Sequence, residues 1–372
     1  MYRWLVMAAL AFLPLQAFAD RPPAVVPRNT ATIIETLPRG YAALTPIVRG
    51  KPASLVQVQQ LLGTAARTGD ARLAARAEAL LSRIPERGQS PDMLRARAFS
   101  AQHRHDFDRA VTILDALIAD QPRDGDARLS RAQIHLVQGR LDLARADCAA
   151  LAFAVDSGRG LLCVAALSLR TGDLRSAATS VDRWLLQAPA DDQSRRYVLV
   201  MRGEIASRSA ADDADSWFGR ALALAPDDVR TLAAYSRHLR AAGRNSDALR
   251  LLAPAANSDG LQLERALAAR ASGATAAPAL AAEQGRRYRL AHELGSQPEL
   301  RDEAEYFLTL RGDANQALAL ASKNFQQQRD FEDVRLLQRA ALAANRPDAL
   351  DGLRAWAKSQ GLTLGATAGS TP

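Results

Sequence analysis

Histidine and cysteine are the residue types in this chain that could bind a metal ion or act as a nucleophile. Five histidines occur, and only His103 and His105 lie close together in the sequence. A zinc site needs several Cys, His or carboxylate ligands that converge on the ion, and none stands at a suitable spacing from this pair. We therefore expect His103 and His105 to lie in a polar turn between two helices, and we predict no metal site and no cofactor.

The sequence motifs of common catalytic sites are absent. There is no Gly-x-Ser-x-Gly elbow, no His-Glu-x-x-His motif, no phosphate loop and no dinucleotide-binding fingerprint. Asp212, Asp213 and Asp215 form a small acidic group, but they lie at a predicted turn, where carboxylates are typical helix caps. We therefore do not expect the chain to be an enzyme.

The overall composition favours a helical protein. Hydrophobic residues make up 48% of the 372 residues, which excludes a mainly disordered chain. Alanine, the strongest helix former, and leucine dominate, while aromatic residues account for only 5%. The formal net charge is +8, but 40 acidic residues are interspersed with the basic ones and few aromatic rings are available for base stacking. We therefore predict no nucleic-acid partner.

Residues 1–19 have the features of a cleavable signal peptide. Arg3 supplies a positive charge, Trp4 to Leu15 is an apolar run, and Ala17-Phe18-Ala19 fits the small residues of a cleavage site. The alternative, an uncleaved anchor, is disfavoured because the run is shorter than the about 20 apolar residues of a membrane-spanning helix. The mature chain is expected to begin at Asp20 and to be periplasmic or secreted, without stable membrane insertion.

Residues 20–53 are expected to form an extended leader. Six prolines lie in or next to this stretch, and each removes a backbone donor and restricts the residue before it. They are Pro22, Pro23, Pro27, Pro38, Pro46 and Pro52. A long helix is therefore excluded here.

Beyond the leader, one short pattern recurs with a period of roughly 34 residues. The pattern is a turn followed by a helix start that ends on alanine. It occurs at Gly69–Ala74, His105–Ala110, Gly139–Ala144, Gly172–Ala177, Gly243–Ala248 and Gly312–Ala317, and Ala214 fills one gap in the series. A proline recurs in register with this pattern. It occurs as Pro122, Pro189 and Pro226, each at the same distance after the alanine of its repeat. Two features that recur in register indicate a true internal repeat.

Each repeat predicts a pair of antiparallel helices. Glycine or a polar residue ends the first helix, the following Asp caps the second, and the alanine lets the two helices approach closely. Proline then ends the second helix, and an acidic pair such as Asp227-Asp228 caps the next repeat. One hairpin cannot bury its own apolar face, so neighbouring hairpins must stack to form the core.

The period, the Gly-Asp turn, the alanine and the terminal proline resemble the tetratricopeptide repeat over residues 54–361. The whole chain also resembles exported bacterial repeat proteins, a resemblance that implies no chemistry. The expected fold is an all-α solenoid of eight or nine stacked hairpins, in which Leu261–Leu294 is a degenerate repeat broken by Gly273 and restarted near Pro278. Residues 362–372 are expected to form a flexible tail.

The resemblance implies a binding scaffold. A stack of hairpins forms a concave groove lined by the first helix of every repeat, and such grooves take an extended peptide or a helix of a partner protein. The alternative is an accessory protein that holds an envelope assembly or a polysaccharide-export complex in place. Both functions need the same fold, so the sequence does not separate them, and it leaves the oligomeric state open.

Cys148 and Cys163 are expected to lie close together. Cys148 is predicted in the second helix of one repeat and Cys163 in the first helix of the next, and these helices are neighbours in a solenoid. An exported protein with two cysteines permits a disulfide. Cysteine is also a good small core residue, and facing helices often hold side chains too far apart for a bond. Both interpretations remain open at this point.

Arginines at equivalent places in the repeats are the candidate ligand contacts. Arg230, Arg237 and Arg240 share one helical face that is expected to look toward the groove. Arg95, Arg159 and Arg196 fall on the same face of other repeats. Guanidinium groups bind carboxylates through paired hydrogen bonds, so the expected partner is a protein or peptide with acidic segments. The alternative is a solvated face whose arginines pair with neighbouring acidic residues.

Overall fold

The computed structural model describes residues 54–84, 90–187, 192–253, 258–295 and 297–364. The signal peptide predicted for residues 1–19 and the leader at residues 20–53 lie outside these ranges, as does most of the predicted tail. Within the described ranges the chain is helical and contains no β-strand. The predicted all-α class is therefore confirmed.

The helices follow one another as nine antiparallel hairpins in the described ranges. The hairpins are α2 (Leu55–Thr68) with α3 (Ala71–Leu81), α4 (Pro91–His103) with α5 (Phe107–Asp120), α6 (Gly125–Val137) with α7 (Leu141–Ala150), α8 (Ser157–Thr171) with α9 (Leu174–Gln187), α10 (Asp192–Arg208) with α11 (Ala214–Leu224), α12 (Val229–Ala241) with α13 (Asn245–Leu252), α14 (Asp259–Ala271) with α15 (Ala277–Glu293), α16 (Leu300–Glu305) with α17 (Ala314–Gln327), and α18 (Phe331–Ala343) with α19 (Asp351–Ser359). Three short turns complete them: the π-helical η1 (Leu151–Val155) and η2 (Tyr306–Arg311), and the 3₁₀ turn η3 (Pro347–Leu350).

The recurring turn ends one helix at each place where the pattern occurs, but its predicted Asp cap forms only in part of the array. Asp106 makes no side-chain cap hydrogen bond to α5, and arginine occupies the N-cap position of α7 and α13. Gly69 follows α2 with φ 67°, a left-handed conformation that costs glycine little, and His105 adopts φ 58° at the corresponding place after α4. Asp70 then accepts a hydrogen bond from the amide of Arg72 at 3.0 Å, and Asp313 caps α17 in the same way. The same local chemistry therefore makes the hairpin turn at both ends of the array.

The repeat alanines lie where two helices meet. Ala110, Ala144, Ala177, Ala248 and Ala317 are all 0% exposed. A methyl group at this point lets the helix axes approach more closely than a larger side chain would. The phase deduced from the sequence is therefore confirmed.

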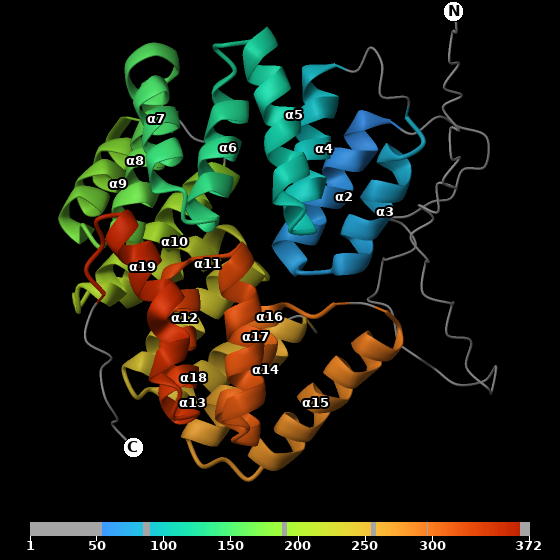
Figure 1. Ribbon diagram of the computed structural model, residues 1–372, viewed down its shortest axis with the longest axis vertical. Coiled ribbons are helices and arrows are strands. Elements are labelled where there is room, and N and C mark those ends of the chain that lie inside the picture. Colours follow the sequence, from blue (N-terminus) through green and yellow to red (C-terminus); the bar gives the residue numbers. More distant parts are fainter. Residues whose placement is uncertain (1–53, 85–89, 188–191, 254–257, 296, 365–372) are drawn as a thin grey trace, which may run out of the picture.

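The degenerate repeat also forms a hairpin. Gly273 has φ 67° just after α14, and Pro278 lies in the first turn of α15, both as predicted. In Figure 1, α15 leans away from the neighbouring helices. The helical hairpin is therefore kept even in the repeat whose sequence pattern is weakest.

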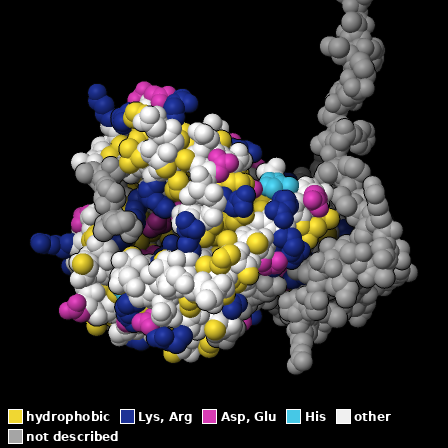
Figure 2. Space-filling model, turned by 90° about the horizontal axis from the view of Figure 1, so that it is seen from below, with side chains coloured by type: hydrophobic (Ala, Val, Ile, Leu, Met, Phe, Trp, Pro, Cys, Tyr) yellow, Lys and Arg dark blue, Asp and Glu magenta, His cyan; other side chains and the backbone are white. Residues whose placement is uncertain are grey.

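The first helices of consecutive hairpins contact one another and form the inner layer of the solenoid. The array winds round until its last hairpin meets its third (Figure 1). There the amide of Arg329 donates to the carbonyl of Val137 at 2.7 Å, and Trp356 Nε1 donates to the carbonyl of Gly139 at 3.1 Å. The amide of Leu141 donates to Gln360 Oε1 at 3.1 Å. Figure 2 shows a hollow inside the wound chain, with basic and acidic side chains at its wall.

Candidate binding surface

Five of the six predicted arginines connect the first helices of consecutive hairpins. Arg95 on α4 pairs with Asp124, the N-cap residue of α6. From the other side of α6, Asp126 pairs with Arg159 of α8 at 2.7 Å. The other three pairs are Arg196–Asp228 between α10 and α12, and Arg237–Glu264 and Arg240–Glu264 between α12 and α14. These arginines therefore form ion pairs that link the first helix of one hairpin to the first helix of the next.

Arg95 and Arg159 line a common pocket of about 610 Å³, which we call the arginine pocket. Its wall is built from the starts of α4, α6 and α8 and the turn that precedes α6. The complete lining is Arg95, Gln121, Pro122, Arg123, Asp124, Gly125, Val155, Asp156 and Arg159. Three arginines therefore face two aspartates at one open depression.

Hydrogen bonds hold the charged side chains of the arginine pocket in place. Asp156 caps α8 by accepting the amide of Arg159 at 2.8 Å, and this backbone bond is the main reason that the pKa of Asp156 lies below its usual value. Partial burial opposes a charged Arg159, but its bonds to Asp126 and Asp156 raise its pKa overall. Both groups are charged at neutral pH.

Arg230 differs from the other five arginines because its described contact is with an aromatic ring. Its guanidinium carbon lies 4.7 Å from the ring centre of Tyr197 on α10. Arg230 is solvent-exposed as a residue; the protein atoms packed around its guanidinium group oppose its charge, but Tyr197, Glu204 and Asp228 raise its pKa overall. Arg237 and Arg240 instead both form ion pairs with Glu264. The three arginines that were predicted to share one face therefore have different partners, an aromatic ring for Arg230 and a carboxylate for the other two.

The start of α18 supplies a further set of contacts inside the curve of the solenoid. Arg170 of α8 forms an ion pair with Asp330, and Arg208 of α10 lies 4.0 Å from the ring centre of Phe331. Arg208 also donates to the carbonyl of Leu169 at 2.6 Å. None of these residues was singled out from the sequence, because the contacts with the start of α18 join parts of the chain more than a hundred residues apart. The concave side is therefore partly occupied by the chain itself.

His103 and His105 lie where the sequence placed them. His103 is the last residue of α4, and His105 is in the turn that follows. His105 Nε2 lies 3.7 Å from Glu299, which immediately precedes α16. Over the described ranges, no group of three or more His, Cys, Asp or Glu residues is arranged to hold a metal ion.

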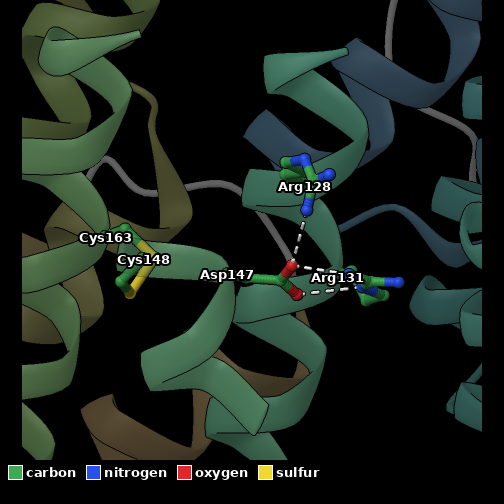
Figure 3. The surroundings of a disulfide bond; sticks show 5 residues. All are labelled: Arg128, Arg131, Asp147, Cys148 and Cys163. Atoms are coloured by element: carbon green, nitrogen blue, oxygen red, sulfur yellow. Dashed lines mark hydrogen bonds and ion pairs between the residues drawn. A yellow bond between two sulfur atoms is a disulfide. The ribbon is translucent and has the colours of Figure 1, made fainter. Parts of the chain in front are cut away.

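Cys148 and Cys163 are joined by a disulfide between α7 and α8 (Figure 3). The neighbouring Asp147 points the other way, toward α6, where it accepts hydrogen bonds from Arg131 at 2.6 and 2.9 Å. Arg128 approaches the same carboxylate at 3.5 Å. The end of α7 is thus tied to α8 by a covalent bond and to α6 by ion pairs.

No helix in the described part of the chain combines the length and the apolar character that crossing a bilayer requires.

No family model matches the chain, and no curated protein matches it. A tetratricopeptide repeat protein from Parabacteroides merdae is 18% identical, with a TM-score of 0.41, over 68% of this chain and 99% of that one. The APC/C hetero-tetramer Cut9–Hcn1 is 14% identical, with a TM-score of 0.37, over 78% of this chain and 63% of that one. The P58(IPK) TPR domain is 16% identical, with a TM-score of 0.22, over 78% and 98%. The tetratricopeptide-like assignment rests on the repeat and the helix packing described above.

Proposed function

We propose that this solenoid is a scaffold that binds an extended segment of a partner protein at the arginine pocket. The observation that supports this proposal is a depression of about 610 Å³ whose wall combines three guanidinium groups with the start of a helix. The N-terminus of a helix carries a partial positive charge that favours an anionic group. Asp124 and Asp156 already accept amide hydrogens at the starts of α6 and α8.

Arg123 is the arginine best placed to contact a carboxylate of the partner. It is exposed, and no ion pair of Arg123 with another described residue occurs. Arg95 and Arg159 are already paired with aspartates, so they position the wall of the pocket and supply a favourable field. The proposed partner segment therefore carries at least one Asp or Glu residue, which agrees with the acidic preference expected from the sequence.

Peptide display on the purified protein tests this function. Peptides selected from a random library should be enriched in Asp and Glu, and Arg123→Gln should weaken their binding roughly tenfold because a charge-assisted hydrogen bond is lost. Arg250→Gln is the matched control, since Arg250 lies on α13, is 74% exposed and pairs only with Asp247 of its own helix among the described residues. Selected peptides that bind the wild type and the Arg123→Gln variant equally well would contradict the proposal.

A further inference from the structure

A second depression is also lined by η1, and we call it the η1 groove. Val155 of η1 lines the arginine pocket, whereas Ala152 of η1 lines the η1 groove. The groove has a volume of about 360 Å³. Its lining is Ala152, Ser157, Gly160, Leu161, Val164, Ser180, Arg183 and Gln187, from η1, α8 and α9.

Two large apolar side chains, each next in sequence to a lining residue, are almost fully exposed. Phe153 follows the lining residue Ala152 and is 91% exposed, and Leu186 precedes the lining residue Gln187 and is 87% exposed. Exposed leucine or phenylalanine is common singly, but two such residues beside a depression with small and apolar walls are a typical feature of a docking surface.

The backbone under Phe153 is held rigidly. The disulfide joins Cys148, just before η1, to Cys163 on α8. At Gly160 a Cβ atom would lie only 2.5 Å from the Cα of Ala152, so α8 approaches η1 as closely as glycine permits. Phe153 is therefore presented on a fixed turn, which reduces the entropy lost when a partner binds.

Arg183 gives the η1 groove a charge preference. The lining contains this one cation and no Asp or Glu. The neighbouring Asp182 is engaged elsewhere, because it pairs with Arg202 of α10 at 3.0 Å. Arg183 is exposed, and no ion pair links it to another described residue. A carboxylate from outside the chain would meet a guanidinium group that needs no rearrangement of existing ion pairs.

We propose that the η1 groove binds a segment of a partner polypeptide in which an apolar side chain is followed closely by Asp or Glu. The apolar side chain packs on Leu161 and Val164 of the groove wall. It also packs on the exposed side chains of Phe153 and Leu186, which are next in sequence to lining residues, and the carboxylate pairs with Arg183. A second copy of the chain fits less well, because the same face would bring another Arg183 and no unpaired carboxylate among the lining residues. This groove is separate from the arginine pocket, and its occupant does not depend on the function proposed for that pocket.

Fluorescence anisotropy with defined peptides tests the proposal. The probes are fluorescein-labelled decapeptides with one Leu-Leu-Glu core, and matched probes in which Lys replaces Glu or Ser replaces both leucines. The Glu peptide should bind, and each of Arg183→Gln, Phe153→Ser and Leu186→Ser should weaken its binding about tenfold. The Lys and Ser peptides should bind at least as weakly as the Glu peptide binds those variants.

A matched control keeps the outcomes distinct. Arg175→Gln, an exposed arginine on the same helix α9 outside the groove lining, should leave the affinity unchanged. Absence of binding by the Glu peptide, or equal affinity in the Arg183→Gln variant, would overturn the proposal. Concentration-dependent dimerisation that Phe153→Ser abolishes would also overturn it, because the occupant would then be a second copy.

Discussion

The second helices of the hairpins pack differently in two regions of the molecule, the hairpins formed by α6 to α9 and the hairpin formed by α14 and α15. In the first region, the second helices bury small residues against their partners, among them Ala144 and Ala177, and a disulfide crosses between hairpins. In the second region, α15 is 17 residues long, yet its buried residues are Gln284, Gly285 and Tyr288. Burial raises the pKa of Tyr288, which places its phenol in a poorly hydrated environment.

This difference shows what the repeat alanine contributes. Where alanine occupies the crossing point, a second helix can pack against its partner and also against the next hairpin. Where no alanine is buried on the second helix, that helix packs mainly on its own partner, as α15 does on α14. Stability should therefore be concentrated in the α6–α9 region, and changes there should have larger effects than changes in α15.

Removal of the disulfide should have the largest effect. Replacing Cys148 and Cys163 by serine is expected to lower the free energy of unfolding by about 2–4 kcal/mol, because the unfolded chain gains conformational freedom. Urea denaturation of the double variant and the wild type measures the difference. Equal stability of the two proteins would show that the α6–α9 region does not depend on this bond.

Overpacking of the alanine position should follow in size. Ala144→Leu is expected to lower the free energy of unfolding by about 1–3 kcal/mol, because a larger side chain forces α7 away from its partner helix. Ala146→Leu is the matched control, since Ala146 is exposed on the same helix. If the two variants had the same melting temperature, the assigned role of the buried alanines would be wrong.

The weaker region should gain stability from a core residue. Gln284 is only 1% exposed, and its amide makes no hydrogen bond of normal geometry with a described residue; the phenol of Tyr288 is its polar neighbour. Gln284→Leu is expected to raise the free energy of unfolding by about 1 kcal/mol, because a buried unpaired amide is replaced by an apolar group of similar size. Chemical denaturation of both proteins provides the measurement, and a clear loss of stability would contradict this view of α15.

The smallest expected effect is a pH dependence in the α6–α9 region. His135 of α6 is buried, and burial is the main cause that lowers its pKa below the usual value of about 6.5. The unfolded chain therefore binds a proton more readily, and the stabilisation from neutral His135 is lost as the pH falls below about 6.5. Melting temperatures between pH 7.5 and 5.5 should fall less in a His135→Gln variant. An identical fall in both proteins would assign the dependence to other groups.

The hairpins were predictable from the sequence because their signals are local. Glycine or His105 at a left-handed turn, Asp70 as a cap and the buried alanines each act within a few residues of their position in the chain. The proximity of Cys148 and Cys163 followed from the order of neighbouring helices, but the choice between a bond and two free core residues did not.

The partners of the arginines were not predictable in the same way. Arg95 and Arg159 were predicted to share one face of the repeats, but their pairing with Asp124 and Asp126 depends on how tightly consecutive first helices approach. The sequence does contain one indication of these pairs: acidic residues lie at the start of the first helix of the neighbouring hairpin. The contacts of Arg170 and Arg208 with residues at the start of α18 had no signal, because they depend on the curvature of the whole array.

The contact between the last hairpin and the third changes how such an array should unfold. A linear stack of repeats frays from its ends, since each repeat is held only by its neighbours. Here the hydrogen bonds of Arg329 and Trp356 to the turn between α6 and α7 anchor the end of the array to its middle. The C-terminal hairpin cannot fray without the loss of contacts that also support the third hairpin. The repeats should therefore unfold as one cooperative unit, and the long sequence separation of these contacts should make folding slower than that of an open stack of equal length.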